Sequence, residues 1–348
     1  MQNFDNTVKN ILISFLFITV IYILYVLQSI LIPLFLALLV AIMFQPLIVF
    51  LLKIKTPSWL ILPTISIITL GILFGLFFLV NEILEDLLVN QDFILKRLNL
   101  KMDSMLKWIN KNTGLRFNAN DDFGGIFRFF TKTQITKTLG NLANSLGSFT
   151  TSFVTFSLYY IVLLSGISNY KSYIGYVAQN EDSKILENFE KIQKSVYSYM
   201  IIKTALSLIM AILIYFICSF FRVNFAFLWA FLTFILNFIP SVGSIAATIL
   251  PTLMSFVQFE DTQIVVLILL TITFIHFAIG NILEPIIMGD KLKLNTLTVI
   301  FSLVFWGYLW GIPGMILSVP LMVIIKLIFE QFPSLEIVSR ILGKTIKI

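Results

Sequence analysis

The sequence predicts an all-α polytopic membrane protein with about eight membrane helices, including two broken, re-entrant hairpins, and a helical extramembrane segment. Three observations support this prediction. Hydrophobic residues make up 58% of the chain and charged residues only 12%, whereas soluble domains carry roughly 25% charged residues. Apolar runs long enough to cross a bilayer recur along the chain. In the last third, glycine and proline divide two such runs into short arms.

The N-terminal membrane region is predicted at 1–80. Its three apolar runs are 11–27, 32–52 and 59–80. No small-residue cleavage site follows the first run, so we interpret it as an uncleaved spanning helix. Lys53 and Lys55 follow the second run. Because cytoplasmic loops are rich in lysine and arginine, this loop and the N-terminus are predicted to be cytoplasmic.

Residues 81–148 form a predicted extracytoplasmic segment that mixes acidic and basic side chains. Apolar residues from Ile94 to Ile109 recur at helical spacing, which predicts an amphipathic helix. The segment serves as an outer vestibule, as an oligomer contact or as a solvated spacer; the sequence leaves these alternatives open.

Four further regions complete the predicted organisation. They are a membrane helix at 149–166, a cytoplasmic amphipathic helix at 167–198, a transport core at 199–332 and a basic cytoplasmic tail at 333–348. The transport core follows one plan twice, because a span precedes a broken hairpin in each half. The two breaks are Pro240–Gly243 and Gly311–Gly314. The first hairpin is predicted to start and end outside the membrane and the second inside, so the two halves have inverted topology. Such an inverted pair places a site near the bilayer midplane in many secondary transporters. The alternative is that each hairpin spans fully as two short helices.

Glu284 is the sharpest charged candidate in the transport core. It follows Asn281 by three residues, so the two side chains share a helical face, and Pro285 frees backbone carbonyls nearby. Acids within spans are costly and mark functional sites. An interfacial cap is the alternative role. His276 lies in the same run and serves either as a proton relay or as a neutral histidine bonded to a neighbouring helix.

The remaining candidates are the tip residues of the two hairpins, whose half-helix ends offer N–H groups and carbonyls to a polar solute. They are Asn237, Pro240, Ser241 and Gly243 in the first tip, and Gly311, Pro313 and Gly314 in the second.

Several function classes are excluded by composition. The chain has one cysteine, Cys218, and one histidine, His276, so neither a cysteine cluster nor a histidine pair is available for a metal. Neither HExxH nor GxSxG occurs, and we predict no enzyme activity and no cofactor. The net charge of +6 is spread between spans without a basic-aromatic array, which argues against a nucleic-acid partner.

The motifs around the two breaks resemble those of the autoinducer-2 exporter family of bacterial permeases. The resemblance rests on Asn237–Gly243 with Pro251, Asn281–Gly289, Gly311–Gly314 and Ser318–Pro320, in that order and at the family's spacing. Ser244 departs from the pattern, because many members carry proline shortly after the first motif. The hydropathy plan matches over nearly the whole chain.

The resemblance implies a multi-pass transporter of the bacterial inner membrane. The basic residues after the second span and in the tail predict that both termini are cytoplasmic. It also implies a homo-oligomer, since pentameric members are known. The leading hypothesis is a secondary-type permease that exports a small polar molecule, with the quorum signal autoinducer-2 as a candidate. The first alternative is a sodium (or lithium)/proton antiporter, and the second is a passive channel or membrane scaffold. The expected partners are the lipid bilayer, a small polar solute and a coupling ion, either proton or sodium.

Overall fold

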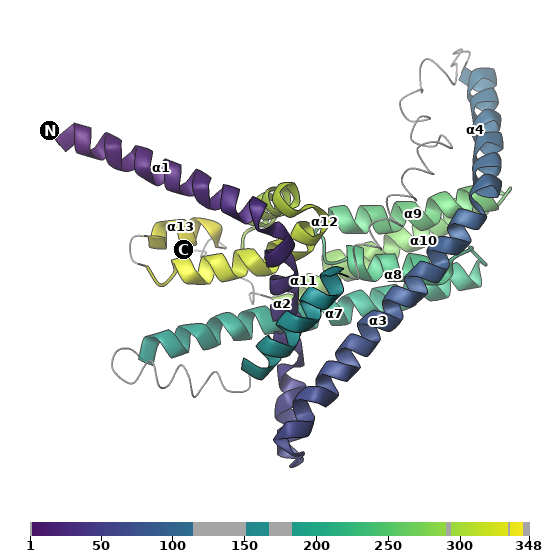
Figure 1. Cartoon of the computed structure of the whole chain (residues 1–348). Coiled ribbons are helices and arrows are strands. Elements are labelled where there is room, and N and C mark those ends of the chain that lie inside the picture. The colour runs from purple at the N-terminus through teal and green to yellow at the C-terminus, as the bar shows by residue number, and fades with distance from the viewer. Residues whose placement is uncertain (1, 114–150, 167–182, 290–293, 333–334, 344–348) are drawn as a thin grey trace.

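The computed structural model describes residues 2–113, 151–166, 183–289, 294–332 and 335–343, and these residues are almost entirely helical (Figure 1). The helices are α1 (Gln2–Val26), α2 (Gln28–Lys53), α3 (Ser58–Val89), α4 (Gln91–Thr113), the helix Thr151–Gly166, α7 (Ser183–Phe220), α8 (Ala226–Leu236), α9 (Val242–Gln258), α10 (Thr262–His276), the π-helix η1 (Phe277–Leu283), α11 (Glu284–Met288), α12 (Thr296–Phe329) and α13 (Glu336–Leu342). An isolated antiparallel bridge joins Leu294 to Gly343. The predicted features at 114–150, 167–182, 290–293, 333–334 and 344–348 lie outside the described residues.

The class predicted from the sequence is confirmed. Six helical segments in the described part of the chain are long and apolar enough to cross a membrane. They are Thr7–Val26, Gln28–Lys53, Trp59–Val89, Glu190–Phe220, Thr262–Met288 and Thr296–Phe329. Shorter apolar helices are Thr151–Gly166, α8 and α9. The protein is therefore an all-α polytopic membrane protein.

Helix α7 joins two elements that the sequence predicts separately. The charged stretch that begins at Ser183 continues without interruption into the apolar span and ends at Phe220, over 38 residues. Neither glycine nor proline occurs between these limits, so the sequence has no signal that would end the helix at residue 198.

A hydrophobic core joins α2, α7 and α12. Its buried members include Leu39 of α2, Tyr199 of α7 and Leu317 of α12. Helix α1 projects away from this core in Figure 1. Near its C-terminal end, the Leu24 carbonyl accepts a hydrogen bond of 3.0 Å from the indole Nε1 of Trp310, which ties α1 to α12.

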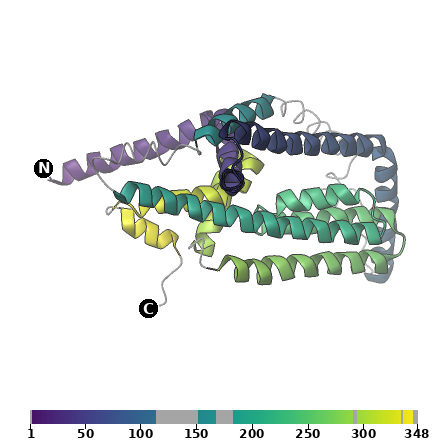
Figure 2. The same cartoon turned by 90° about the horizontal axis from the view of Figure 1, so that it is seen from below.

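Helices α3 and α4 form a long bent arm on one side of the molecule. Figure 2 shows α4 (blue) crossing one end of the helices α7 to α10 (teal to green). There the Lys101 Nζ donates to the carbonyls of Phe259 at 2.5 Å and Glu260 at 3.2 Å. Arg97 forms a longer ion pair of 3.4 Å with the Glu260 carboxylate. The arm is therefore attached to the α9–α10 connection.

The first hairpin is formed by α8 and α9, which fold back on each other at Pro240 and Ser241. Ser241 has φ 59° and ψ −54°, and Val242 N donates to Pro240 O at 2.6 Å, which defines a γ-turn of the strained, positive-φ kind. The arms then approach closely, because a Cβ on Gly243 would lie 1.7 Å from the Leu236 carbonyl oxygen. Glycine is therefore required at 243.

The second hairpin is α12 itself, folded back at Gly311, where φ is 63° and ψ is −143°. The Ser302 Oγ donates to the Ser318 carbonyl at 2.7 Å, so the arms before and after Gly311 lie side by side. A Cβ on Gly314 would lie 2.0 Å from the Trp306 carbonyl oxygen. Both hairpins thus use a glycine shortly after the turn to bring one arm against a backbone carbonyl of the other.

The segment between α10 and α11 is a π-helix, η1, rather than a regular α-helix. The Glu284 N–H donates to the Ile279 carbonyl, five residues earlier, and Pro285 has no N–H to donate. The proline therefore removes the hydrogen bond that an α-helix would give to Asn281. Single π-turns within α-helices are frequent at functional sites.

Candidate functional site

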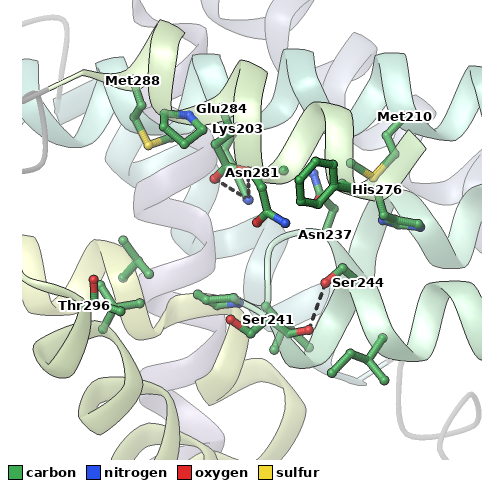
Figure 3. Close-up of a pocket in the computed structure, with 18 of the residues that line it drawn as sticks. Lys203, Met210, Asn237, Ser241, Ser244, His276, Asn281, Glu284, Met288 and Thr296 are labelled. Carbon is green, nitrogen blue, oxygen red and sulfur yellow. Dashed lines mark hydrogen bonds and ion pairs between the residues drawn. The ribbon is translucent and has the colours of Figure 1, made fainter. Parts of the chain in front are cut away.

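A cavity of about 730 Å³ lies between α7, the tip of the first hairpin, the α10–η1–α11 segment and the start of α12. In the view of Figure 3, Met288 and Thr296 mark its left side and Met210 and His276 its right side. Glu284, Lys203 and Asn281 lie between these two ends in the same view. The middle of the cavity is therefore lined by polar side chains from α7, η1 and α11.

An ion pair between Lys203 and Glu284 is the central feature of this cavity. The Lys203 Nζ lies 2.7 Å from Glu284 Oε1 and 2.8 Å from Oε2, so the ammonium bridges both carboxylate oxygens. The Lys203 side chain is 6% exposed and that of Glu284 is 20% exposed. The carboxylate is thus the more accessible partner.

One face of α7 supplies the groups that surround this ion pair. Tyr199, Lys203 and Ser207 are spaced four residues apart and therefore lie on the same face of the helix. The Ser207 hydroxyl accepts a hydrogen bond of 2.8 Å from the Asn237 amide at the end of α8. This bond holds the first hairpin against α7 next to the ion pair.

The tip of the first hairpin forms a wall rich in hydroxyl groups. Pro240, Ser241, Ser244 and Thr248 all line the cavity. Ser244 Oγ donates to the Ser241 carbonyl at 2.9 Å, and Thr248 Oγ1 donates to the Ser244 carbonyl at 2.9 Å. In both bonds a hydroxyl donates to a backbone carbonyl of the preceding turn, which fixes the side-chain orientation around the γ-turn.

The α10–η1–α11 segment contributes His276, Gly280, Asn281, Glu284 and Pro285 to the opposite wall. The π-turn widens the helix here, and the missing N–H of Pro285 leaves backbone carbonyl oxygen available close to the carboxylate. The wall therefore combines an amide, a carboxylate and carbonyl oxygen on one side of a cavity.

The histidine at 276 is buried, with 7% of its surface exposed. Neither Nδ1 nor Nε2 has a hydrogen-bond partner among the residues that the structure describes. Of the two sequence-based roles, the histidine bonded to a neighbouring helix is therefore not observed within the described ranges.

The candidates from the sequence fall into two groups. The first group lines the cavity and consists of Asn237, Pro240, Ser241, His276, Asn281, Glu284 and Pro285. Gly243, Gly311, Pro313 and Gly314 do not line it. Gly243 acts in the packing of the first hairpin, and the second tip lies where Trp310 contacts α1. The second hairpin instead reaches the cavity through Thr296, Val299 and Val319 of its arms.

Sequence reasoning missed Lys203, Tyr199 and Ser207. The available signal was Lys203 itself, because an ionisable residue inside an apolar span marks a functional site. It lies only a few residues into the span predicted at 199–220, where lysines commonly extend to the membrane surface. The continuous α7 places it well inside the helix instead.

The charges and hydrogen-bonding groups favour an uncharged polar ligand. The ion pair is neutral as a unit, and its two groups offer donors and acceptors respectively. Asn281 and the hydroxyls of the hairpin tip each offer hydrogen-bond donors and acceptors. Within the described ranges, no three His, Cys, Asp or Glu side chains gather in a way that would hold a metal ion.

Comparison with known proteins agrees with this architecture. The model of a family described as "AI-2E family transporter" matches residues 12–334. The AI-2 transport protein TqsA of Escherichia coli K12 is 31% identical over 312 residues, which cover 87% of this chain and 86% of TqsA. A protein of Borreliella burgdorferi named "Putative transport protein" is 32% identical over 222 residues, which cover 63% of this chain and 59% of that protein. These relatives carry the names of transport proteins and not of enzymes. The chain belongs to the AI-2E family of membrane transporters.

Proposed function

We propose that this protein is a secondary-type transporter that exports a small polar molecule through the cavity beside the first hairpin. The observation that carries the proposal is the buried Lys203–Glu284 ion pair in a cavity walled by the hairpin tip and the π-turn. Buried charges are costly unless they are paired, and within membrane spans they mark solute and ion pathways.

The proposed transport step is an exchange of partners at the ion pair. A solute hydroxyl accepts from the Lys203 ammonium, and another donates to the Glu284 carboxylate, which is the more accessible partner. The solute then replaces part of the direct contact between the two side chains. Because Ser207 and Asn237 link the same face of α7 to the hairpin, a change at the ion pair can reach the hairpin tip.

The name of the relative TqsA supports autoinducer-2 as a candidate solute. The neutral character of the ion pair also supports an uncharged polar solute over an anion or a cation. The test is export of autoinducer-2 from cells that lack their own exporter. Expression of this protein should raise the extracellular signal, and Glu284→Gln should abolish the rise at equal membrane abundance. Wild-type protein that leaves the signal unchanged would contradict autoinducer-2 as the solute.

A sodium (or lithium)/proton antiporter is the second candidate function. This candidate is supported by the accessible Glu284 carboxylate, which lies next to Pro285, a residue that donates no backbone hydrogen bond to the preceding turn. Hard cations such as sodium prefer oxygen ligands of this kind. Everted membrane vesicles distinguish the two candidates. If sodium collapses a proton gradient in vesicles with wild-type protein but not in vesicles with Glu284→Gln, the antiporter is favoured. If sodium does not collapse the gradient and the solute is exported, the permease is favoured.

We further propose that the protein lies in the bacterial inner membrane as a homo-oligomer with cytoplasmic termini, and that both hairpins are re-entrant. Helix α8 has 11 residues and α9 has 17, so each arm is shorter than the roughly 20 residues that cross a bilayer. The test labels Ile312→Cys, in a Cys218→Ser background, with a membrane-impermeant maleimide. Labelling from outside in intact cells would show that the second hairpin crosses the membrane.

A further inference from the structure

Asn295 joins the end of α13 to the start of α12. Its backbone N–H donates to the Leu342 carbonyl at 3.2 Å, and its Nδ2 donates to the Ile341 carbonyl at 2.6 Å. Its Oδ1 accepts from the Thr298 N–H at 2.6 Å and caps α12. The last carbonyls and the first N–H groups of helices lack partners within their own helix. One residue therefore satisfies both helix ends at this contact.

This contact closes the second hairpin at the end opposite its tip. The arms of α12 meet at Gly311 and lie side by side through the Ser302–Ser318 hydrogen bond. Helix α13 follows the second arm in the chain, yet it binds the residue that begins the first arm. It therefore ties the start of one arm to the end of the other.

The start of the first arm forms one wall of the cavity. Leu294, Thr296 and Val299 all line it. Figure 3 shows Thr296 on the same side of the cavity as Met288. Among the described residues, the hydrogen bonds that join residues 294–299 to another helix all end on α13. The opposite wall, the tip of the first hairpin, is instead bonded to α7. The α12 wall therefore depends on α13 for its polar attachment.

Helix α13 itself has little apolar contact with the rest of the protein. Ile337 and Ile341 are 73% and 66% exposed, and the buried residue of this helix is Ser339. An element with little apolar burial opens locally at a lower free-energy cost than the core. The attachment of α13 therefore depends on its hydrogen bonds to Asn295.

We propose that α13 is a clasp, whose release from Asn295 lets the wall formed by Leu294, Thr296 and Val299 move and widens this end of the cavity. The structure shows the closed clasp. The clasp controls access to the cavity for any solute, so the inference goes beyond the proposed export function.

The first measurement follows the release of α13 by thiol modification. Ser339→Cys in a Cys218→Ser background places the only thiol of the chain at a buried position. Full-length protein in lipid nanodiscs reacts with trimethylammonium-ethyl methanethiosulfonate, and mass spectrometry gives the rate. Asn295→Asp keeps an acceptor for the Thr298 N–H but has no donor for the Ile341 carbonyl. The loss of one hydrogen bond should raise the rate about threefold to tenfold.

The second measurement follows the cavity. Thr248→Cys, in the same Cys218→Ser background, places the thiol on the opposite wall. Asn295→Asp should raise its modification rate as well, because the wall at the start of α12 moves away. An unchanged rate at 248 with a faster rate at 339 overturns the clasp, since α13 then releases without moving the wall. An unchanged rate at 339 overturns it too.

Two controls separate the release of α13 from other effects. Arg340→Gln removes the ion pair with Glu336, whose side chains are 77% and 53% exposed, and should leave both rates unchanged. The native Cys218 lies in the core between α7, α8 and α10 and reports on unfolding of the whole protein. Its rate in Asn295→Asp, with no other thiol present, should equal that in wild type. Equal acceleration of Cys218 overturns the clasp, and so does an effect of Arg340→Gln as large as that of Asn295→Asp.

A disulfide provides the opposite change. Leu294 and Gly343 form an isolated antiparallel bridge, and residues paired in this way have Cα atoms about 4.5–5.5 Å apart, which suits a disulfide. Gly343 has φ −82° and ψ 170°, which cysteine also adopts. The variant Leu294→Cys/Gly343→Cys, in the Cys218→Ser background, is placed in proteoliposomes. Efflux of autoinducer-2 should be slower after oxidation than after reduction.

This last measurement separates the clasp from the proposed function. Equal efflux before and after reduction of a fully crosslinked sample overturns the control of access by the clasp. If neither this variant nor wild type releases autoinducer-2, the proposed export function is contradicted. The thiol rates at 339 and 248 then decide for or against the clasp by themselves.

Discussion

Lys203 and Glu284 are 81 residues apart in the sequence, yet the lysine ammonium lies within 2.8 Å of both carboxylate oxygens. Removal of one partner leaves the other charge buried and unpaired, which costs about 3–5 kcal/mol in other proteins. Glu284→Gln should lower the melting temperature more than Lys203→Met, because Lys203 is the less exposed partner. Thermal unfolding in detergent measures both.

The double variant Lys203→Met/Glu284→Gln completes the thermodynamic cycle. It should be more stable than Glu284→Gln alone, since no unpaired charge remains. Lys53→Met, at an exposed position, is the control and should unfold like wild type. Additive losses in the double variant would show that the two side chains do not stabilise each other.

Gly243 and Gly314 should not tolerate alanine. A Cβ at these positions would lie 1.7 Å and 2.0 Å from backbone carbonyl oxygens, so one arm of each hairpin must move away from the other. Each alanine variant should lose about 3 kcal/mol or more of folding free energy. Gly75→Ala is the matched control, because no atom lies within 4 Å of its Cβ and alanine favours helix. Yield and melting temperature are the measurements; a stable Gly243→Ala would contradict the close approach of α8 and α9.

Ser241 stores backbone strain at the tip of the first hairpin. Its φ is 59° and its ψ −54°, a strained γ-turn conformation that costs about 1–3 kcal/mol. Ser241→Gly should therefore raise the melting temperature, and Ser241→Val should lower it, because a β-branched residue fits positive φ poorly. Thermal unfolding of the two variants gives the comparison. Equal melting temperatures for glycine and valine at 241 would argue against strain at this turn.

Lys101 should matter more than Arg97 for the attachment of α4. Lys101 donates to two backbone carbonyls, whereas the Arg97–Glu260 pair is long and its side chains are 41% and 85% exposed. Lys101→Met should increase hydrogen exchange in α4 and in the α9–α10 connection, because a charged hydrogen bond contributes about 1–3 kcal/mol. Glu260→Gln removes an exposed pair and should leave the exchange rates nearly unchanged. The reverse order of effects would assign the attachment to the ion pair.

Two walls of the cavity, the α10–η1–α11 segment and the tip of the first hairpin, could be predicted from the sequence, because their signals are local. A glutamate followed by proline near the end of an apolar run is rare in membrane helices, and Asn281 shares its face by simple helical spacing. The break at Pro240–Gly243 is local as well, since glycine and proline interrupt an otherwise apolar segment.

The partner of Glu284 could not be predicted from local signals. Lys203 itself is visible as an ionisable residue in an apolar span, and the lack of glycine and proline allows α7 to continue through residue 198. Neither signal indicates that this lysine pairs with a carboxylate 81 residues away. The position of the second hairpin tip relative to the cavity could not be predicted either. The sequence marks the break at Gly311, but the Trp310–Leu24 hydrogen bond places that break against α1 instead of the cavity.

The attachment of α4 through Lys101 has a consequence for how this region can vary between relatives. The lysine contacts the carbonyl groups of Phe259 and Glu260, which every amino acid supplies. Substitutions at 259 and 260 should therefore accumulate without detaching the arm, whereas Lys101 itself should be exchanged only for arginine. A segment held in this way is free to diversify around a constant contact.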